Sequence, residues 1–188
     1  MTTWGWLPLL AGVALAEAVE QTAPGLTVAL KWPNDLLLAA PDTVPDAKAA
    51  GILVQSGTDA VVIGIGMNVS TSRDELDELP VPTATSLHLL GAHVSRTDLL
   101  AAVLTRLDAR YAQWSDVDGD AEACALAADY RRRCSTLGRQ VQVSMPNEQL
   151  RGHAIDIDPA GRLVLDVDGE WHTVSAGDVE HLRTETGG

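Results

Sequence analysis

Three short segments, close together in the chain, carry residue types suited to chemistry on an anionic substrate. They are Lys31-Trp32-Pro33-Asn34-Asp35, Lys48-Ala49-Ala50-Gly51-Ile52-Leu53 and Gly64-Ile65-Gly66-Met67-Asn68. Lys31 and Lys48 are the only lysines in the sequence. Because an ammonium group is a compact point charge, each of them could hold carboxylate or phosphate oxygens.

The other polar and glycine residues of these segments have uses beside such a charge. Pro33 stops a strand, so Asn34 and Asp35 emerge at its end, where ligands of open sheets tend to bind. Gly51, Gly64 and Gly66 permit close approach of a bound molecule to the backbone. The amide of Asn68 offers donors and an acceptor that could recognise a base or a ribose.

Each residue also has an ordinary structural explanation. A single lysine is more often a solvated surface residue, and Asn-Asp after proline is more often a turn. Trp32 by itself is better explained as core or pocket wall than as a stacking platform. The pair Gly64-x-Gly66 does not continue into a dinucleotide-binding fingerprint, because the third glycine position holds Val69.

Elements of regular structure must position these segments. Apolar spacing predicts helices at residues 6–19, 97–114 and 121–133, the second capped by Ser95 or Thr97. Strands are expected at residues 26–31, 35–38, 51–55 and 60–69. The strand at 60–69 is apolar on both faces, which predicts a place in the interior of the sheet. A turn at Gly57-Thr58-Asp59 and a loop at residues 71–82 connect these elements.

The pattern changes after Gly138. Short strands are expected at residues 141–143, 154–157, 163–167 and 171–174, separated by turns at residues 145–147, 158–161 and 168–169. Short strands at this even spacing predict a small β-barrel. The sequence therefore predicts an α+β protein with two domains, residues 1–135 and 136–188, whose boundary lies near Cys134 to Gly138.

Composition narrows the possible partners and the compartment. The net charge is −13 and no basic stripe offsets it, which argues against nucleic-acid binding. The apolar stretch from Leu7 to Val19 is interrupted and shorter than a membrane span requires. Cys124 and Cys134 show no metal-ligand spacing and are typical of reduced thiols in a cytoplasmic protein.

In this order, the three segments resemble the biotin–protein ligase family. Members of that family carry a K-W-P-N-D segment, then K-x-x-G-I-L, then G-x-G-(hydrophobic)-N, and all three are present here without substitution at the defining positions. The run from Gly161 to Val179 is similar to the family's Src-homology-3-like terminal domain. The resemblance implies a mixed-sheet catalytic domain of the class II synthetase type, followed by a small Src-homology-3-like β-barrel.

The resemblance also implies a reaction in two steps. ATP and biotin form biotinyl-5′-AMP and pyrophosphate, and the adenylate then acylates a lysine on the biotin carboxyl carrier domain of an acyl-CoA carboxylase. Lys48, Asp35 and Asn34 are implied as catalytic residues, with Lys48 holding the reacting oxygens and Asp35 taking the proton of the amine. Mg²⁺ would accompany ATP, and no residue is expected as a dedicated metal ligand. The residues implied in substrate and nucleotide binding are Lys31, Trp32, Gly51, Ile52, Leu53, Gly64, Gly66 and Asn68.

One departure from the family pattern concerns the basic loop G-R-G-R-x-G-R, which does not occur in these 188 residues. That loop and an upstream Ser/Thr-Asn segment are expected before residue 1, so the chain is expected to be an N-terminally truncated catalytic domain with impaired activity. Three alternatives stay open: a non-catalytic remnant that binds adenylate or the carboxylase acceptor, a lipoate ligase, and a biotin-sensing repressor. The repressor would need a helix-turn-helix, for which the sequence gives no support.

Overall fold

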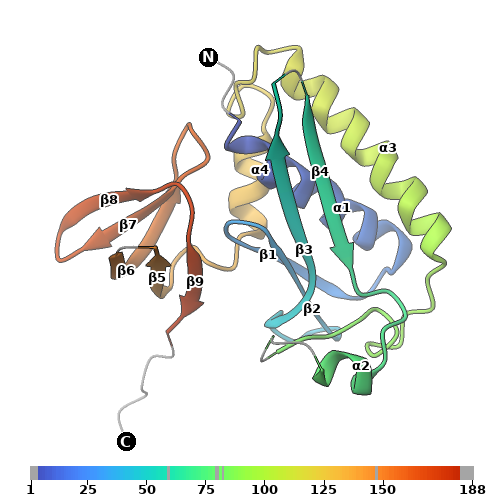
Figure 1. Cartoon of the computed structure of the whole chain (residues 1–188). Coiled ribbons are helices and arrows are strands. Elements are labelled where there is room, and N and C mark those ends of the chain that lie inside the picture. Colours follow the sequence, from blue (N-terminus) through green and yellow to red (C-terminus); the bar gives the residue numbers. More distant parts are fainter. Residues whose placement is uncertain (1–3, 59, 79–80, 82, 147, 183–188) are drawn as a thin grey trace, which may run out of the picture.

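The computed structural model describes residues 4–58, 60–78, 81, 83–146 and 148–182. Within them the chain forms two antiparallel sheets, with helices gathered beside the first (Figure 1). This combination agrees with the expected α+β class. Asp59, Leu79, Pro80, Pro82 and Asn147, which belong to a predicted loop and to predicted turns, lie outside the described residues.

The first sheet has four strands in the order β1-β2-β3-β4. Their bounds are Thr27–Lys31, Asp35–Ala39, Ala47–Ser56 and Val61–Met67. Each neighbouring pair is antiparallel. Among the described residues, parallel pairing with this sheet occurs as isolated bridges, Leu30 with Cys134 and Lys48 with Ala84. The expected mixed sheet is thus an antiparallel sheet with two isolated parallel bridges.

The prediction for the last of these strands was wrong. β4 is an edge strand among the described strands, and its residues alternate between half-buried and exposed. Val62 is 66% exposed, and Gly64 and Gly66 are exposed as well. The sequence pattern misled because glycine counts as apolar although it has no side chain to bury.

Helix α1 (Trp6–Thr22) forms the centre of the helical layer. It packs on the first sheet, and α3 (Arg96–Ser115) and α4 (Leu126–Arg133) pack on it in turn. Because α1 is covered by the sheet and by these two helices, most of its residues are buried. Its sequence is apolar at nearly every position, as expected for a helix without a polar face. Ser95 caps α3 by accepting a hydrogen bond from the backbone amide of Asp98.

In the helical region, one short helix was not predicted and one helix begins later than predicted. The predicted loop contains the short helix α2 (Arg73–Asp77), which Ser72 and Glu75 cap reciprocally. Helix α4 begins five residues later than predicted, at Leu126, because Ala125 adopts a left-handed conformation that interrupts the turn before it.

The second sheet has five strands in the order β8-β7-β6-β5-β9. Their bounds are Gln140–Met145, Glu148–Ile157, Leu163–Val167, Glu170–Val174 and Asp178–His181 for β5 to β9. The four predicted strands are present, but β6 begins six residues earlier than predicted and β9 was not predicted. Polar, exposed residues at the start of β6 concealed the strand. Asp168 and Gly169 both have positive φ, as a tight hairpin turn between β7 and β8 requires.

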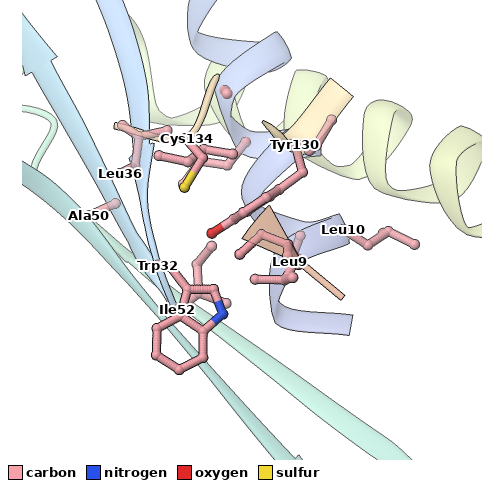
Figure 2. Close-up of a cluster of buried hydrophobic side chains, with 14 of the residues drawn as sticks. Leu9, Leu10, Trp32, Leu36, Ala50, Ile52, Tyr130 and Cys134 are labelled. Carbon is pink, nitrogen blue, oxygen red and sulfur yellow. The ribbon is translucent and has the colours of Figure 1, made fainter. Parts of the chain in front are cut away.

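A continuous hydrophobic core joins the two sheets. Trp32 lies in it with Leu9, Ile52 and Tyr130 (Figure 2). The indole of Trp6 donates a hydrogen bond of 2.9 Å to the carbonyl of Pro159, and that of Trp32 donates one of 3.2 Å to Gly161. Both carbonyls belong to the turn between β6 and β7, so this turn docks the second sheet on the first.

Candidate functional site

An ion pair between Lys48 and Asp35 lies at the junction of β2 and β3. Lys48 Nζ is 2.6 Å from Asp35 Oδ1, and the two side chains are 35% and 14% exposed. Apart from this contact, Asp35 Oδ1 is buried with no hydrogen-bond partner among the described residues. The lysine thus keeps access to solvent while the carboxylate is enclosed.

A β-bulge brings these two residues together. Asp35 pairs with Gly51 across β2 and β3, but the register shifts by one residue between Leu36 and Leu37, so that Leu37 pairs with Lys48. Side chains alternate between the faces of a strand, so the shift moves Lys48 onto the face that carries Asp35. A Cβ atom built on Gly51 would lie 3.6 Å from Lys48 Nζ, which places this glycine against the pair.

Glycines of β3 and β4 form an open floor beside the ion pair. Gly51 pairs with Gly66, and Leu53 pairs with Gly64, on the sheet face away from the helices. Cβ atoms built on Gly64 and Gly66 would meet nothing closer than backbone oxygens at 3.8 and 3.9 Å. Leu53 is 71% exposed on the same face. The floor can therefore accept a flat ligand in contact with backbone.

Val62 borders this floor and was missed by the sequence analysis. It is 66% exposed and pairs with Gln55, one step along the same face from Gly64. The signal that could have found it is the alternation of Val62, Gly64 and Gly66 along a single strand. With Leu53, it supplies apolar surface beside the charged pair.

Asn34, in the turn between β1 and β2, is hydrogen-bonded to β3 at the edge of the site. Its side-chain nitrogen donates to the carbonyl of Ile52 at 2.9 Å, and its own carbonyl accepts from the amide of Ile52 at 2.8 Å. The donor side of this amide is therefore committed to holding the sheet. Asn34 is placed to position Asp35, the next residue in the chain.

Asn68 has a similar structural task at the end of β4. Its side-chain nitrogen donates to the carbonyl of Thr85 at 3.1 Å, and its backbone amide donates to Ala49 at 2.8 Å. Thr85 in turn donates its amide to the carbonyl of Lys48 at 2.9 Å. The segment around Thr85, which the sequence analysis did not single out, thereby supports the backbone of Lys48.

The remaining predicted site residues are Trp32, Ile52 and Lys31. Trp32 and Ile52 are 1% and 3% exposed and belong to the core, so their side chains do not face the floor. For Trp32 this supports the structural explanation over a direct ligand contact. Lys31 pairs with Asp35 across β1 and β2 and is half-buried.

The surroundings of Lys31 include a histidine from the second sheet. Burial of His181, with smaller contributions from the charges of Arg139 and Lys31, lowers the pKa of this imidazole to about 4. His181 is therefore neutral near pH 7. The end of β9 thus lies within electrostatic range of the first predicted segment.

Other features of the described chain offer less chemistry. A separate hollow of about 310 Å³ near the start of α3 is lined by Val69, Ser70, His88, Ala92, His93, Val94 and Ser95. Among the described residues, no cluster of three or more histidine, cysteine or acidic side chains is arranged to hold a metal ion. None of the described helices is both long and apolar enough to cross a membrane.

Comparison with known proteins points to one family. Residues 136–182 match the model of the biotin protein ligase C-terminal domain. A biotin–[acetyl-CoA-carboxylase] ligase from Mycobacterium tuberculosis is 43% identical over 184 residues, covering 96% of this chain. The chain spans 64% of the length of that relative.

Solved structures share the fold. The apo biotin protein ligase from Aquifex aeolicus matches with a TM-score of 0.78 at 20% identity, over 96% of this chain and 76% of that chain. The Aquifex aeolicus ligase in complex with biotin and ATP matches with a TM-score of 0.73 at 21% identity, over 96% and 72%. At these identities the likeness establishes the arrangement of the elements.

Proposed function

We propose that this chain, which is related to the biotin protein ligases along nearly its whole length, carries the acyl-transfer half of a biotin–[acetyl-CoA-carboxylase] ligase site. The observation that carries the proposal is the ion pair of Lys48 and Asp35 beside an open floor of glycines. A cation, an enclosed carboxylate and exposed backbone are the parts that formation and use of an acyl-adenylate require.

In the first step, Lys48 would steady the reacting anions. A carboxylate oxygen of biotin attacks the α-phosphorus of ATP, and the bond to the bridging oxygen breaks to release pyrophosphate. Lys48 is 35% exposed, so its ammonium can turn from Asp35 toward the biotin carboxylate and the α-phosphate. Charge on those oxygens is greatest in the transition state, where a positioned cation lowers the barrier.

The second step would use Asp35. The amine of an acceptor lysine attacks the carbonyl carbon of biotinyl-5′-AMP, an amide bond forms, and AMP leaves with the electrons of the broken acyl–oxygen bond. The attacking nitrogen must lose a proton, and Asp35 is the carboxylate beside Lys48. Once Lys48 engages the adenylate, Asp35 is released from the ion pair and its carboxylate can face the attacking amine.

The glycine floor would hold the rest of the adenylate. Gly51 and Leu53 are proposed to contact biotin, and Gly64 and Gly66 to contact the nucleotide at close range. Asn68 supports this edge through its bond to Thr85. Mg²⁺ is proposed to enter with ATP, bound chiefly by the phosphate oxygens.

The first sheet and its helices, within residues 1–135, would form the class II synthetase-like domain. Residues 136–188 would form the Src-homology-3-like barrel. The acceptor would be the biotin carboxyl carrier domain of an acyl-CoA carboxylase, which places the reaction in the cytoplasm.

A non-catalytic adenylate-binding role is the second candidate. It is favoured by the pairing of Lys48 with Asp35 at 2.6 Å, because a bound anion must displace the carboxylate from the ammonium. Each charge-assisted contact contributes about 1.5–3 kcal/mol, so residues 1–188 alone are expected to bind ATP weakly. A reaction that starts from preformed biotinyl-5′-AMP does not require ATP binding.

The test is transfer of biotin from preformed biotinyl-5′-AMP to a purified carboxyl carrier domain, followed by mass spectrometry. The chain should accelerate transfer over the protein-free reaction, and Lys48→Ala should remove the acceleration more completely than Lys31→Ala does. Binding of the adenylate without accelerated transfer would favour the non-catalytic role. Equal transfer from lipoyl-5′-AMP would argue against specificity for biotin.

A further inference from the structure

The hydroxyl of Thr136 lies between the first predicted segment and the second sheet. Thr136 is fully buried, and its Oγ1 accepts a hydrogen bond of 3.1 Å from the backbone amide of Trp32. The same Oγ1 lies 3.3 Å from Nε2 of His181, the last residue of β9. A hydroxyl can accept and donate at once, so one oxygen can serve both neighbours.

Backbone contacts fix both ends of this link. The amide of Ser135 donates to the carbonyl of Leu30 at 2.7 Å, which attaches the connector between the sheets to the end of β1. On the other side, the amide of Leu182 donates to Gln140 at 2.9 Å and ties the end of β9 to β5. These backbone hydrogen bonds fix the positions of Thr136 beside β1 and of His181 beside β5.

The link reaches the proposed site through the backbone of Trp32. This residue follows Lys31 directly, and Pro33 alone separates it from Asn34 and Asp35. The Trp32 indole is also held by Gly161, so a rotation of its peptide plane would have to move Lys31 and Asn34. A misplacement of about 1 Å at reacting groups can cost roughly 100-fold in rate.

We propose that Thr136 and His181 are positioning residues, which let the second sheet hold the Lys31–Asp35 segment in the geometry needed for acyl transfer. This inference rests on the proposed function. The second sheet then contributes to the reaction although its residues do not border the glycine floor. Docking of that sheet becomes a condition for activity.

The experiment compares Thr136→Val, Thr136→Ser and the control Thr173→Val in the 188-residue chain. Valine keeps the shape of threonine but cannot accept the Trp32 amide hydrogen bond, whereas serine retains the hydroxyl. Thr173 is exposed on the edge strand β8 of the same sheet. Two quantities are measured: hydrogen exchange of the Trp32 amide by NMR, and transfer from biotinyl-5′-AMP to the carboxyl carrier domain.

Thr136→Val should exchange the Trp32 amide about tenfold faster and lower kcat about tenfold, with KM for the acceptor within about twofold of wild type. Thr136→Ser should restore both quantities, and Thr173→Val should change neither. If Thr136→Val does not fold, His181→Ala serves instead, with a smaller effect of about threefold that His181→Gln should reverse.

Unchanged exchange and kcat in Thr136→Val, or equal effects in Thr173→Val, would overturn the inference. A failure of the proposed function has a different signature. In that case the wild-type chain shows no transfer, and the exchange rate of the Trp32 amide alone decides whether the link exists.

Discussion

In the proposed reaction, Lys48 and Asp35 use their opposite charges in two successive steps. In the structure they neutralise each other at 2.6 Å, so a ligand must compete with the carboxylate for the lysine. The competition means that Asp35 weakens anion binding in the resting state and is released once an anion is bound. In the proposed reaction, Asp35 limits when Lys48 can bind an anion, and anion binding by Lys48 frees Asp35 to accept a proton.

Replacing Asp35 with asparagine should separate the two steps. Asp35→Asn keeps the shape of the side chain but removes the charge that competes for Lys48, so affinity for biotinyl-5′-AMP should stay equal or increase. Transfer to the acceptor should fall by about 10²-fold, because only this step removes a proton from an amine. Calorimetry measures the affinity and single-turnover kinetics the transfer. Loss of affinity together with unchanged transfer would reject the base role.

A side chain placed on the glycine floor should block the ligand without disturbing the fold. Gly66→Val projects into open space, since a Cβ atom there would lie 3.9 Å from the nearest atom, the carbonyl oxygen of Gly51. We expect a thermal midpoint within a few degrees of wild type and a loss of adenylate affinity of at least about tenfold. Leu100→Val, exposed on α3 in the helical layer and so away from the floor, is the control. Undiminished affinity in Gly66→Val would remove the floor from the site.

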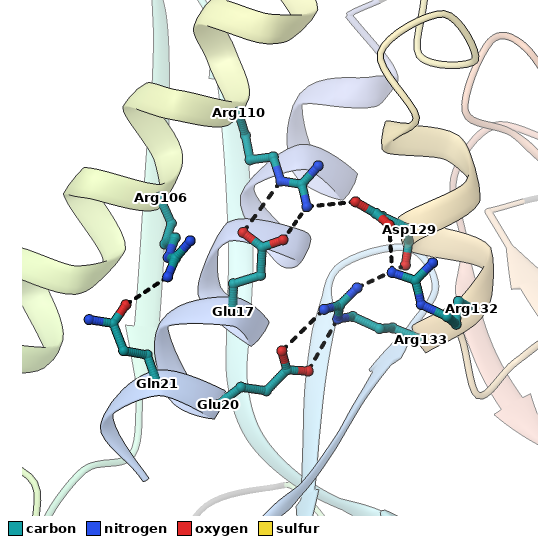
Figure 3. Close-up of polar contacts among 8 residues, drawn as sticks. All are labelled: Glu17, Glu20, Gln21, Arg106, Arg110, Asp129, Arg132 and Arg133. Carbon is teal, nitrogen blue, oxygen red and sulfur yellow. Dashed lines mark hydrogen bonds and ion pairs between the residues drawn. The ribbon is translucent and has the colours of Figure 1, made fainter. Parts of the chain in front are cut away.

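Among the elements, an ion-pair network joins helices α1, α3 and α4. Arg110 of α3 bonds to Glu17 of α1 and lies 2.6 Å from Asp129 of α4, while Arg133 of α4 reaches Glu20 (Figure 3). Burial alone would raise the pKa of Asp129, but hydrogen bonds from Arg132 and Arg110 lower it overall. The carboxylate is therefore stabilised in its charged form.

Removing Arg110 should destabilise this helical layer. Arg110→Met leaves Glu17 and Asp129, which are 13% and 17% exposed, without their shared partner, and we expect a loss of about 2 kcal/mol in the free energy of unfolding. Arg106→Met, on the same helix, removes an exposed bond to Gln21 and should cost less than about 0.5 kcal/mol. Urea denaturation at pH 7 measures both values. Equal losses would show that the network adds nothing beyond ordinary surface contacts.

Sequence patterns predicted most elements of the fold, and the errors have physical causes. Strands β1 and β2 and helix α3 follow from apolar periodicity, which directly reflects burial, whereas β3 begins at Ala47, four residues before its predicted start. The bulge that aims Lys48 at Asp35 leaves no mark in that periodicity, so the contact between the two side chains was not predicted. The backbone hydrogen bonds of the Asn34 and Asn68 side chains could not be predicted either. An asparagine that binds a ligand and one that binds backbone have the same appearance in a sequence.

At the scale of the whole molecule, the second sheet is attached to the first by buried polar contacts. His181 is one of them, and its low pKa makes the attachment dependent on pH. The unfolded chain takes up a proton at this histidine near pH 6.5, whereas the folded chain does so only near pH 4. The free energy of unfolding should therefore fall as pH decreases from about 6.5 to about 4.

His181→Gln should flatten this dependence, because glutamine can keep a contact with Thr136 and does not titrate. Both proteins are denatured with urea at about pH 7, 5.5 and 4.5, which spans the titration of His181. The carboxylates are the same in both proteins, so the difference in stability isolates the contribution of His181. The difference in stability between variant and wild type should shift in favour of the variant as pH falls. A difference that stays constant with pH would show that His181 titrates alike in the folded and unfolded chains.

The proposed function requires that an acyl-adenylate lies on the glycine floor and is held by Lys48. NMR titration of the 188-residue chain with biotinyl-5′-AMP tests it most directly, because amide shifts locate the ligand whether or not turnover occurs. We predict shifts that concentrate at Gly51, Leu53, Gly64 and Gly66, with an affinity at least about tenfold lower in Lys48→Ala. Shifts that concentrate instead around the hollow of His88 and His93, or an affinity unaffected by Lys48→Ala, would contradict the account.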